Sequence, residues 1–503
     1  MEDKMLLAVA ASLLFVFLSK LISLATKPRL NLPPGPWTLP LIGSIHHLAS
    51  SDSVHRVLRR LAREHGPLMQ LWFGEVPTLI VSSPEAAQEI LKNHDLTFAD
   101  RHLTSTTAAF SFGGNDVVFG AYGERWRQLR KLLTQELLTA ARVRSFRRIR
   151  EEEVARLVRG IAASADGATA VNLSEMVANM INDTVVRCSV GSRCRHSGEY
   201  LAALRAMARQ TSGLSIADLF PSSKLASAVA IAPRMAVANR GKMERIIGQI
   251  IQERREQMES GNETESKCSL DVLLKIQKEG GTPIAVTNEV IVVLLMDMFA
   301  GGSDTSSTTL IWTMAELIRS PRVMAKVQSE IRQTFQGKST ITEDDLAQLS
   351  YLKMVMKEAL RLHCPAPLLA PRRCRETCKI MGYDVPKGTS VFVNVWAMCR
   401  DSKYWEDAEE FKPERFENNN IEYKGNNFEF LPFGSGRRIC AGINLGLANM
   451  EFALVNLLYH FDWKLPNGML PEDLDMSEAP GLVAAKGTSL SACPVTRIVP
   501  SYE

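Results

Sequence analysis

The chain has 503 residues, of which 46% are hydrophobic and 23% charged, and its net charge is only +4. This is the composition of an ordinary folded protein, and so weak a charge does not indicate a nucleic-acid partner. The nine cysteines are scattered and form no C-x-x-C pair. Neither a zinc site nor a disulfide framework is therefore predicted, and a reducing compartment fits the chain best.

The first 30 residues predict a membrane anchor. Residues 5–18 are apolar apart from Ser12, and after Lys20 the uncharged run continues to Thr26. As a helix, residues 5–26 would span about 33 Å, which matches the hydrocarbon core of a bilayer. A cleaved signal peptide is the alternative, although no small-residue cleavage site follows. Because acids precede the segment and basic residues follow it, we expect a single-pass protein with its body in the cytosol.

Three prolines at residues 33, 34 and 36 predict a stiff extended hinge over residues 31–43. Residues 44–503 are predicted to form one large domain, with helices near 54–65 and 84–94. Between them, residues 68–81 predict a β-hairpin that turns at Gly74-Glu75. Helical spacing dominates from there to about residue 361, residues 260–267 predict an exposed loop, and strands are expected around 379–393. The predicted fold class is mainly α with small β-sheets.

One predicted helix carries a dense run of charge. Residues 143–161 form an apolar stripe, while Arg144, Arg147, Arg148 and Arg150, followed by three glutamates at 151–153, occupy the other face. Such a run is typical of a solvated helix face.

A cysteine near the C-terminus stands in a specific pattern, Phe433-x-x-Gly436-x-Arg438-x-Cys440-x-Gly442. Most cysteines of this kind of chain are small buried hydrophobic residues, but the surroundings of this one favour another interpretation. The glycines permit a tight loop, and the apolar run over 445–461 predicts a helix whose positive end lies near the sulfur. Both effects favour a thiolate, which is the form that binds a metal. Arg438 is placed to meet a carboxylate.

Two further spacings pair charged or aromatic side chains. Glu358 and Arg361 share one helix face, and Arg415 follows in a Pro-Glu-Arg-Phe segment at 413–416. Taken alone, this spacing is common and favours a surface ion pair. Trp126 and Arg130 also share a helix face, for which a cation–π packing pair is the alternative.

The long apolar segment 288–320, ended by Pro321, predicts a buried helix. A second membrane span is the alternative, but Asp297 and the stretch 301–304 interrupt the apolar run. Within that stretch, Gly301-Gly302 indicates a locally widened helix. Asp304 beside Thr305 provides an acid and an alcohol that can carry protons, while back-bonding of the hydroxyls to the helix is the alternative.

These motifs resemble, in their order and over nearly the whole chain, those of the cytochromes P450, the haem-thiolate monooxygenases. The loop around Cys440 resembles the family's haem-binding loop, with Ala441 where the family usually has proline. The resemblance implies a helical prism around a buried haem b, with Cys440 as the axial thiolate ligand of the iron. The remaining cofactor-binding residues that it implies are Arg438, Trp126, Arg130, Arg372, Phe433, Gly436 and Gly442, with Arg101 as a further candidate although His102 replaces the usual proline.

The same resemblance assigns roles away from the cysteine loop. Glu358, Arg361 and Arg415 would form the family's buried network behind the haem, where charges are tolerated only when paired. The stretch 301–306 resembles the family's oxygen-activating motif, so Thr305 and Asp304 are the implied catalytic residues.

The implied reaction inserts one oxygen atom from O₂ into a C–H bond of a lipophilic substrate. Electrons would come from NADPH through NADPH–cytochrome P450 reductase at the endoplasmic reticulum membrane, and the basic residues at 125–131 offer a surface for an acidic redox partner. Several stretches (31–37, 428–432 and 462–466) resemble grass members of the family that oxidise sesquiterpene or diterpene hydrocarbons to defence compounds. Successive oxidation of one methyl group to an acid belongs to that expectation.

Two alternatives stay open. One is a haem-thiolate isomerase or dehydratase that acts without O₂ or NADPH, which the proton-carrying pair Asp304 and Thr305 argues against. The other is a membrane protein that binds haem without catalysis.

Overall fold

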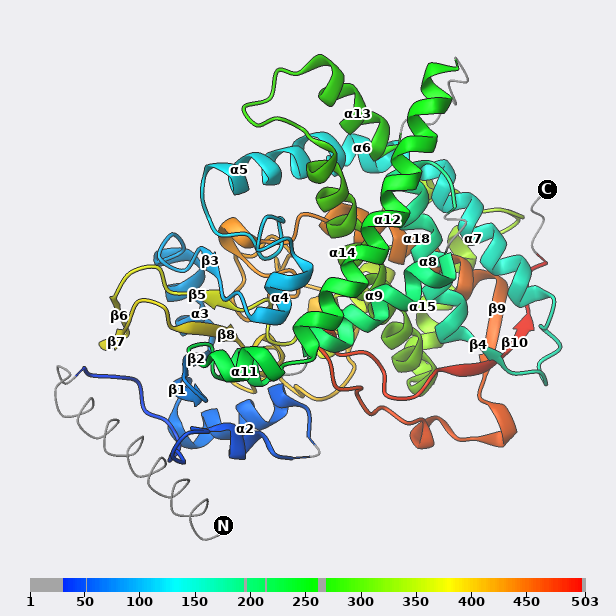
Figure 1. The fold of residues 1–503 in the computed structure, drawn as a ribbon. Coiled ribbons are helices and arrows are strands. Elements are labelled where there is room, and N and C mark those ends of the chain that lie inside the picture. Colours follow the sequence, from blue (N-terminus) through cyan, green and yellow to red (C-terminus); the bar gives the residue numbers. More distant parts are fainter. Residues whose placement is uncertain (1–29, 51, 194–196, 213–214, 261–267, 500–503) are drawn as a thin grey trace, which may run out of the picture.

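The computed structural model describes residues 30–50, 52–193, 197–212, 215–260 and 268–499. The predicted anchor at 1–30 lies outside these ranges apart from its last residue, and so does the predicted loop at 260–267 apart from its first. Within the described residues the fold is mainly helical with small sheets, as predicted (Figure 1). The helices are α2 (Val54–His65), α3 (Pro84–Gln88), α4 (Ser105–Phe110), α5 (Glu124–Lys131), α6 (Ala140–Ser145), α7 (Arg147–Ala162), α8 (Leu173–Val190), α9 (Ser197–Ser212), α10 (Ile216–Leu219), α11 (Lys224–Val229), α12 (Ala232–Glu259), α13 (Ser269–Glu279), α14 (Asn288–Arg319), α15 (Pro321–Thr334), α16 (Ser350–Leu362), α17 (Val395–Met398) and α18 (Ile443–His460).

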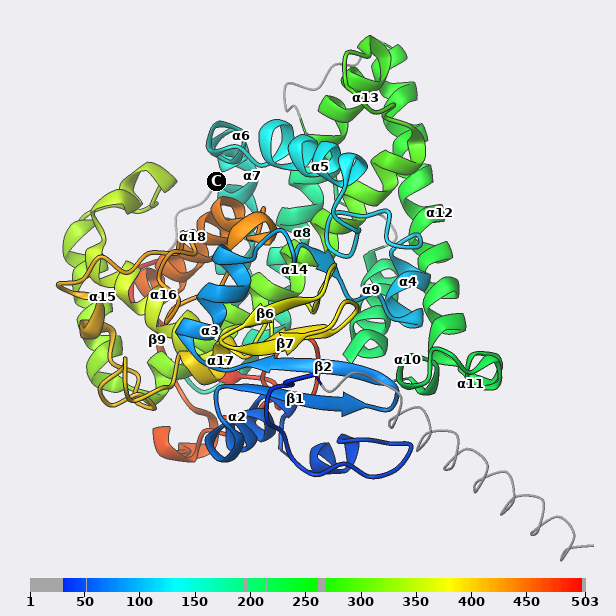
Figure 2. The ribbon, with the colours of Figure 1, turned by 90° about the vertical axis from the view of Figure 1, so that its left-hand side faces the viewer.

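The strands form a mixed sheet in the order β1-β2-β8-β5-β3 and two smaller antiparallel sheets, β4-β10-β9 and β6-β7. In Figure 2, β1 and β2 run side by side at the lower edge of the body, with α2 next to them. The strands are β1 (Leu68–Phe73), β2 (Val76–Val81), β3 (Asp100–Arg101), β4 (Val171–Asn172), β5 (Arg372–Arg373), β6 (Cys378–Ile380), β7 (Tyr383–Val385), β8 (Ser390–Val393), β9 (Phe461–Lys464) and β10 (Ser491–Thr496).

The predicted β-hairpin is confirmed, with β1 paired antiparallel to β2 and its turn at Gly74. Gly74 has a φ of +61°, and a Cβ there would lie 2.3 Å from the Leu219 carbonyl oxygen. A glycine is therefore required both by the turn and by the close approach of the segment before α11. The predicted hinge lies against the same sheet, because the Gln70 N–H donates to the Pro34 carbonyl at 2.8 Å.

Helix α14 runs through the helical core and contacts both α8 and α18 (Figure 1). Its N-terminus is capped by Thr287, whose hydroxyl accepts the Val290 N–H, and its C-terminus is followed by Pro321, which begins α15. In the described part of the chain it is the one helix long and apolar enough to span a membrane. Most of its side chains are buried inside the protein, so the prediction of a buried core helix is confirmed.

The prediction of a solvated charged face on α7 is wrong for two residues. Arg150 and Glu153 are each only 1% exposed. Arg150 binds Glu343 at 2.7 Å, and Glu153 binds Arg187 of α8 at 2.6 Å. The partners lie far away in the sequence, so the helix pattern alone does not indicate that these charges are paired and buried.

Candidate active site

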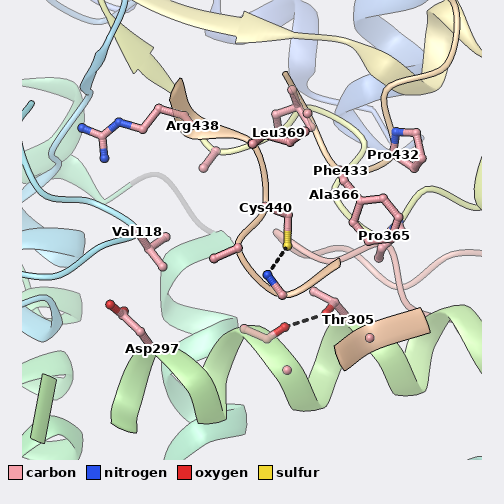
Figure 3. Close-up of a pocket in the computed structure, with 18 of the residues that line it drawn as sticks. Val118, Asp297, Thr305, Pro365, Ala366, Leu369, Pro432, Phe433, Arg438 and Cys440 are labelled. Carbon is pink, nitrogen blue, oxygen red and sulfur yellow. Dashed lines mark hydrogen bonds between the residues drawn. The ribbon is translucent and has the colours of Figure 1, made fainter. Parts of the chain in front are cut away.

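A cavity of about 300 Å³ lies between α14 and the loop that precedes α18. Segments distant in sequence close it: residues 365–372, the start of α18, the loop at 117–118, and side chains of β3, α5 and β5. Figure 3 shows the sulfur of Cys440 directed toward this space, with Thr305 and Asp297 on the helix opposite. The structure thus brings the predicted cysteine loop and the predicted glycine-containing helix to the two sides of one cavity.

The loop around Cys440 is held by backbone contacts. The Cys440 N–H donates to the Phe433 carbonyl at 2.9 Å, and the Gly442 N–H donates to the Cys440 sulfur at 3.3 Å. Gly436 has a φ of +69°, and a Cβ there would lie 2.4 Å from the Leu91 carbonyl oxygen. Gly436 therefore serves the close packing of the loop and lies outside the cavity lining, whereas Phe433 and Gly442 line the cavity.

The acidity of the thiol differs from the sequence-based expectation. Cys440 is open to the cavity but lies deep in the protein. Burial raises the pKa of the Cys440 thiol above its ordinary value, and the Gly442 N–H and the Arg130 charge offset only part of that rise. The loop alone thus does not lower the pKa of this thiol. A bound metal ion deprotonates such a ligand outright.

Four buried or half-buried arginines line the cavity together. Arg101 and Arg372 are neighbours because β3 pairs with β5 in the register Arg101↔Arg372, and Arg130 and Arg438 come from α5 and the cysteine loop. Their hydrogen bonds go largely to backbone carbonyls: Arg130 donates to Ile439, and Arg438 donates to Ala99 at 2.8 Å.

In this cluster the positive charge of the arginines exceeds the negative charge of the aspartates around it. Burial and the charge of Arg372 lower the pKa of Arg438 to about 9, and burial and Arg438 lower the pKa of Arg101 well below its ordinary value. Arginines nevertheless stay protonated in proteins, so the guanidinium groups repel one another until an anion arrives. Arg372 alone has a close carboxylate partner, Asp95 at 3.0 Å. A metal-ligating sulfur facing such a cluster fits an iron porphyrin that carries two carboxylates.

Trp126 lies behind this cluster. Its indole N–H donates to the Val117 carbonyl at 3.0 Å, and the Arg438 guanidinium stacks over its ring at 4.0 Å. The side chain is buried and does not line the cavity. The structure therefore places Trp126 as a support for Arg438, and its direct contact with the cofactor stays a prediction.

On the opposite wall, Thr305 lines the cavity and Asp304 does not. The Thr305 hydroxyl donates to the Gly301 carbonyl at 2.6 Å, which is the back-bonded alternative. Helix α14 is α-helical throughout, so the expectation of a locally widened helix is wrong. Gly302 has a packing role instead, since a Cβ there would lie 3.2 Å from the Val185 side chain of α8, whereas a Cβ on Gly301 would have no packing partner within 4 Å in the ranges that the structure describes.

A buried ion network holds the region behind the cysteine loop. Glu358 and Arg361 are each 0% exposed, and the Arg361 Nε donates to the Glu358 Oε2 at 2.8 Å. The Arg415 Nε binds Glu358 Oε1 at 3.0 Å, and the Lys412 N–H donates to the same oxygen at 2.8 Å. Arg361 also donates to the carbonyls of residues 399, 408 and 410. The surface-pair alternative is therefore excluded.

Asp297 lines the cavity, and the sequence motifs did not single it out for that role. Its Oδ2 accepts the Val117 N–H at 2.8 Å. Burial, and then the charge of Asp116, raise the pKa of Asp297 well above its ordinary value. In the sequence, Asp297 could have been recognised as an acid within an otherwise apolar helix. Only the structure shows that its side chain lines the cavity.

Comparison with known proteins identifies the family. A family model described as "Cytochrome P450" matches residues 33–490. "Ent-cassadiene hydroxylase" of Oryza sativa subsp. japonica is 65% identical over 512 residues, which cover 100% of this chain and 99% of the relative. "Dolabradiene monooxygenase" and "Zealexin A1 synthase" of Zea mays are 62% and 61% identical, and each alignment covers 99% of both proteins. The chain therefore belongs to the cytochrome P450 family and is a monooxygenase that uses haem b and receives electrons from NADPH through a reductase.

Proposed function

We propose that this chain hydroxylates a sesquiterpene or diterpene hydrocarbon in plant defence metabolism, with successive oxidation of one methyl group to an acid as an extension of the same chemistry. The observation that carries the proposal is the apolar part of the cavity wall near Cys440, formed by Met298, Pro365, Ala366 and Leu369. Such a wall binds hydrocarbon surface by removing it from water. The similar proteins named for cassadiene, dolabradiene and zealexin support the same substrate class.

The arrangement of the cavity supports cofactor-binding roles for the predicted residues that line it. Cys440 would ligate the haem iron through its sulfur, and Arg438, Arg130, Arg101 and Arg372 would hold the haem carboxylates. The bound haem supplies the chemistry that activates O₂ for insertion into a C–H bond. The protein excludes water from that space, holds the substrate against it and fixes the loop that carries the sulfur.

Thr305 and Asp304 are the proposed catalytic residues. The Thr305 hydroxyl faces the cavity while its proton is held by the Gly301 carbonyl one turn earlier. In that position it accepts a hydrogen bond from the cavity side. Rotation of the hydroxyl away from Gly301 would let it pass a proton into the cavity, with Asp304, the half-buried acid next to it, as the source.

The reductase is proposed to dock beside α5. Arg125, Arg127 and Lys131 are exposed on this helix, and Arg130 of the same helix contacts the cysteine loop through the Ile439 carbonyl. A basic surface so close to the ligand loop attracts an acidic partner and shortens the path of the electron.

We also propose that the protein is anchored in the endoplasmic reticulum membrane by residues 1–30, with 31–43 as the hinge and 44–503 as the catalytic domain facing the cytosol. Exposed apolar side chains support this topology. Trp37 is 65% exposed on the hinge segment, and Leu225 and Ile231 are 73% and 68% exposed around α11. Both segments adjoin the β1–β2 turn, and we propose that their exposed apolar side chains meet the membrane surface.

The test is product formation in microsomes that contain the protein, its reductase and NADPH. A panel of sesquiterpene and diterpene olefins is supplied, and products are identified by mass spectrometry. Hydroxylated products that require both NADPH and the reductase support the proposal. If every olefin stays unchanged while the haem is fully loaded, or if products form without the reductase, the proposal is wrong.

A further inference from the structure

Asp297 introduces a carboxyl group into the cavity at some distance from the reacting centre. It precedes Thr305 by eight residues on α14, which corresponds to about 12 Å along the helix. Figure 3 shows its carboxyl group near Val118, at the end of the drawn helix away from Thr305. That separation is comparable to the length of a fused terpenoid ring skeleton, so one substrate molecule can reach both positions.

The carboxyl group has one structural partner and one side left for a ligand. Oδ2 accepts the Val117 N–H at 2.8 Å, which fixes the side chain on the cavity wall. The neighbouring charge that acts on Asp297 is Asp116, whose own Oδ1 accepts the Phe119 N–H at 2.7 Å. Asp297 is therefore not neutralised by the arginine cluster. Burial raises its pKa well above the ordinary value. The carboxyl group accepts a hydrogen bond in either protonation state, and in its acid form it also donates one.

A hydrocarbon leaves such a group without a partner. Burying a carboxyl group against apolar surface destabilises the complex unless a hydrogen bond replaces the lost water. A hydroxyl or carbonyl oxygen on the ligand supplies that hydrogen bond. A site built in this way discriminates against the analogue that lacks the oxygen.

We infer that Asp297 binds an oxygen atom already present on the substrate, at the end of the skeleton away from the carbon that is oxidised. The inference rests on the proposed function and extends it to a second substrate class, mono-oxygenated terpenoids. These bind more tightly than the parent hydrocarbons, and an earlier hydroxylation of the same skeleton must supply them. Asp297 is thus a specificity-determining residue, and Thr305 remains at the reacting end.

The test measures dissociation constants from the change that substrates cause in the haem absorption spectrum, which needs no turnover. The probes are a diterpene olefin and its mono-hydroxylated derivative. We expect the wild-type protein to bind the alcohol about tenfold more tightly, which corresponds to one hydrogen bond to a buried group. Asp297→Leu abolishes this preference, chiefly by tightening olefin binding, because no carboxyl group is then left without a partner; Asp297→Asn, which keeps a donor and an acceptor, retains it.

Met298→Leu is the matched control, because it changes a neighbouring apolar wall residue and should alter both constants alike. Equal binding of the two probes by the wild-type protein overturns the inference, and this comparison does not depend on any variant folding. A preference for the alcohol that survives in Asp297→Leu overturns it as well. If the olefin binds and reacts, and binds as tightly as the alcohol, only this inference fails. If neither probe binds, the proposed function fails and the inference fails with it.

Discussion

Glu358 and Arg415 are 57 positions apart in the chain, yet the Glu358 Oε1 and the Arg415 Nε lie 3.0 Å from each other in the interior. Arg361 completes the pairing of the same carboxylate. Removing either partner would leave a buried charge uncompensated, which would lower the free energy of unfolding by about 3–5 kcal/mol. This relationship therefore couples the segment at 413–416 to α16, behind the loop that carries the cysteine.

We expect Glu358→Ala and Arg361→Ala to lose haem as well as activity, because the network fixes the region behind the cysteine loop. The haem-to-protein ratio of the purified variants measures this directly. Glu279→Ala, which breaks an exposed ion pair with Lys275 on α13, is the control and should keep its haem. Normal haem content in either network variant would contradict the assignment.

Replacing Cys440 by alanine should remove the thiolate signature from the carbon monoxide difference spectrum of the reduced protein. The reason is that, among the cysteines of the described residues, Cys440 is the one that lines the cavity. Cys364→Ala is the matched control, since Cys364 is buried and outside the cavity lining. A thiolate spectrum that persists in Cys440→Ala would mean that another ligand holds the iron.

Thr305→Ala should uncouple NADPH consumption from product formation. The variant loses the hydroxyl that faces the cavity, so product should fall by about 100-fold, the lower end of the range for a lost proton-transfer group. Hydrogen peroxide released per NADPH should rise, and a peroxidase assay measures it. Thr313→Ala removes the same kind of back-bond, to the Thr309 carbonyl at 2.7 Å, outside the cavity. Equal coupling in both variants would refute the role of Thr305.

Gly436→Ala and Gly442→Ala should differ in severity. At Gly436 a new Cβ meets the Leu91 carbonyl at 2.4 Å and the φ of +69° is strained for alanine, so we expect a loss of about 1–3 kcal/mol and reduced haem content. At Gly442 the nearest atom is the Cys440 sulfur at 3.9 Å, an ordinary contact. Thermal unfolding of the two variants, followed by haem absorbance, compares them. Equal effects would show that loop packing does not depend on Gly436.

Glu451 on α18 predicts a pH dependence of stability. Burial raises its pKa to about 7 from an ordinary value of 4.5. Between these two values the native protein holds a proton that the unfolded chain has released, so the stabilising contribution is complete below pH 4.5 and is lost as the pH rises through 7. Glu451→Gln should therefore be more stable than the wild type at pH 8, by up to about 3 kcal/mol, and equally stable near pH 4.5. Urea unfolding at both pH values measures this, and a constant difference would contradict it.

The sequence by itself determined the features that depend on neighbours along the chain. The β-hairpin at 68–81 follows from alternation around Gly74, and α14 follows from an apolar run that Pro321 ends. The glycine-rich loop around Cys440 and the Glu358-x-x-Arg361 spacing could also be recognised from the sequence, because each motif lies within about ten consecutive residues. Their common order along the chain was enough to indicate the family.

The tertiary structure decided what distant segments do to one another. Arg101 and Arg372 join one cluster only because β3 pairs with β5, and Arg150 is buried only because Glu343 reaches it. The acidity of Cys440 also depends on the fold, because burial raises the pKa of its thiol by more than the hydrogen bond from the Gly442 N–H lowers it. Asp297 was visible in the sequence as an interruption, but its place on the cavity wall depends on a loop 180 positions away. Burial and long-range pairing are properties of the assembled fold, and local spacing does not encode them.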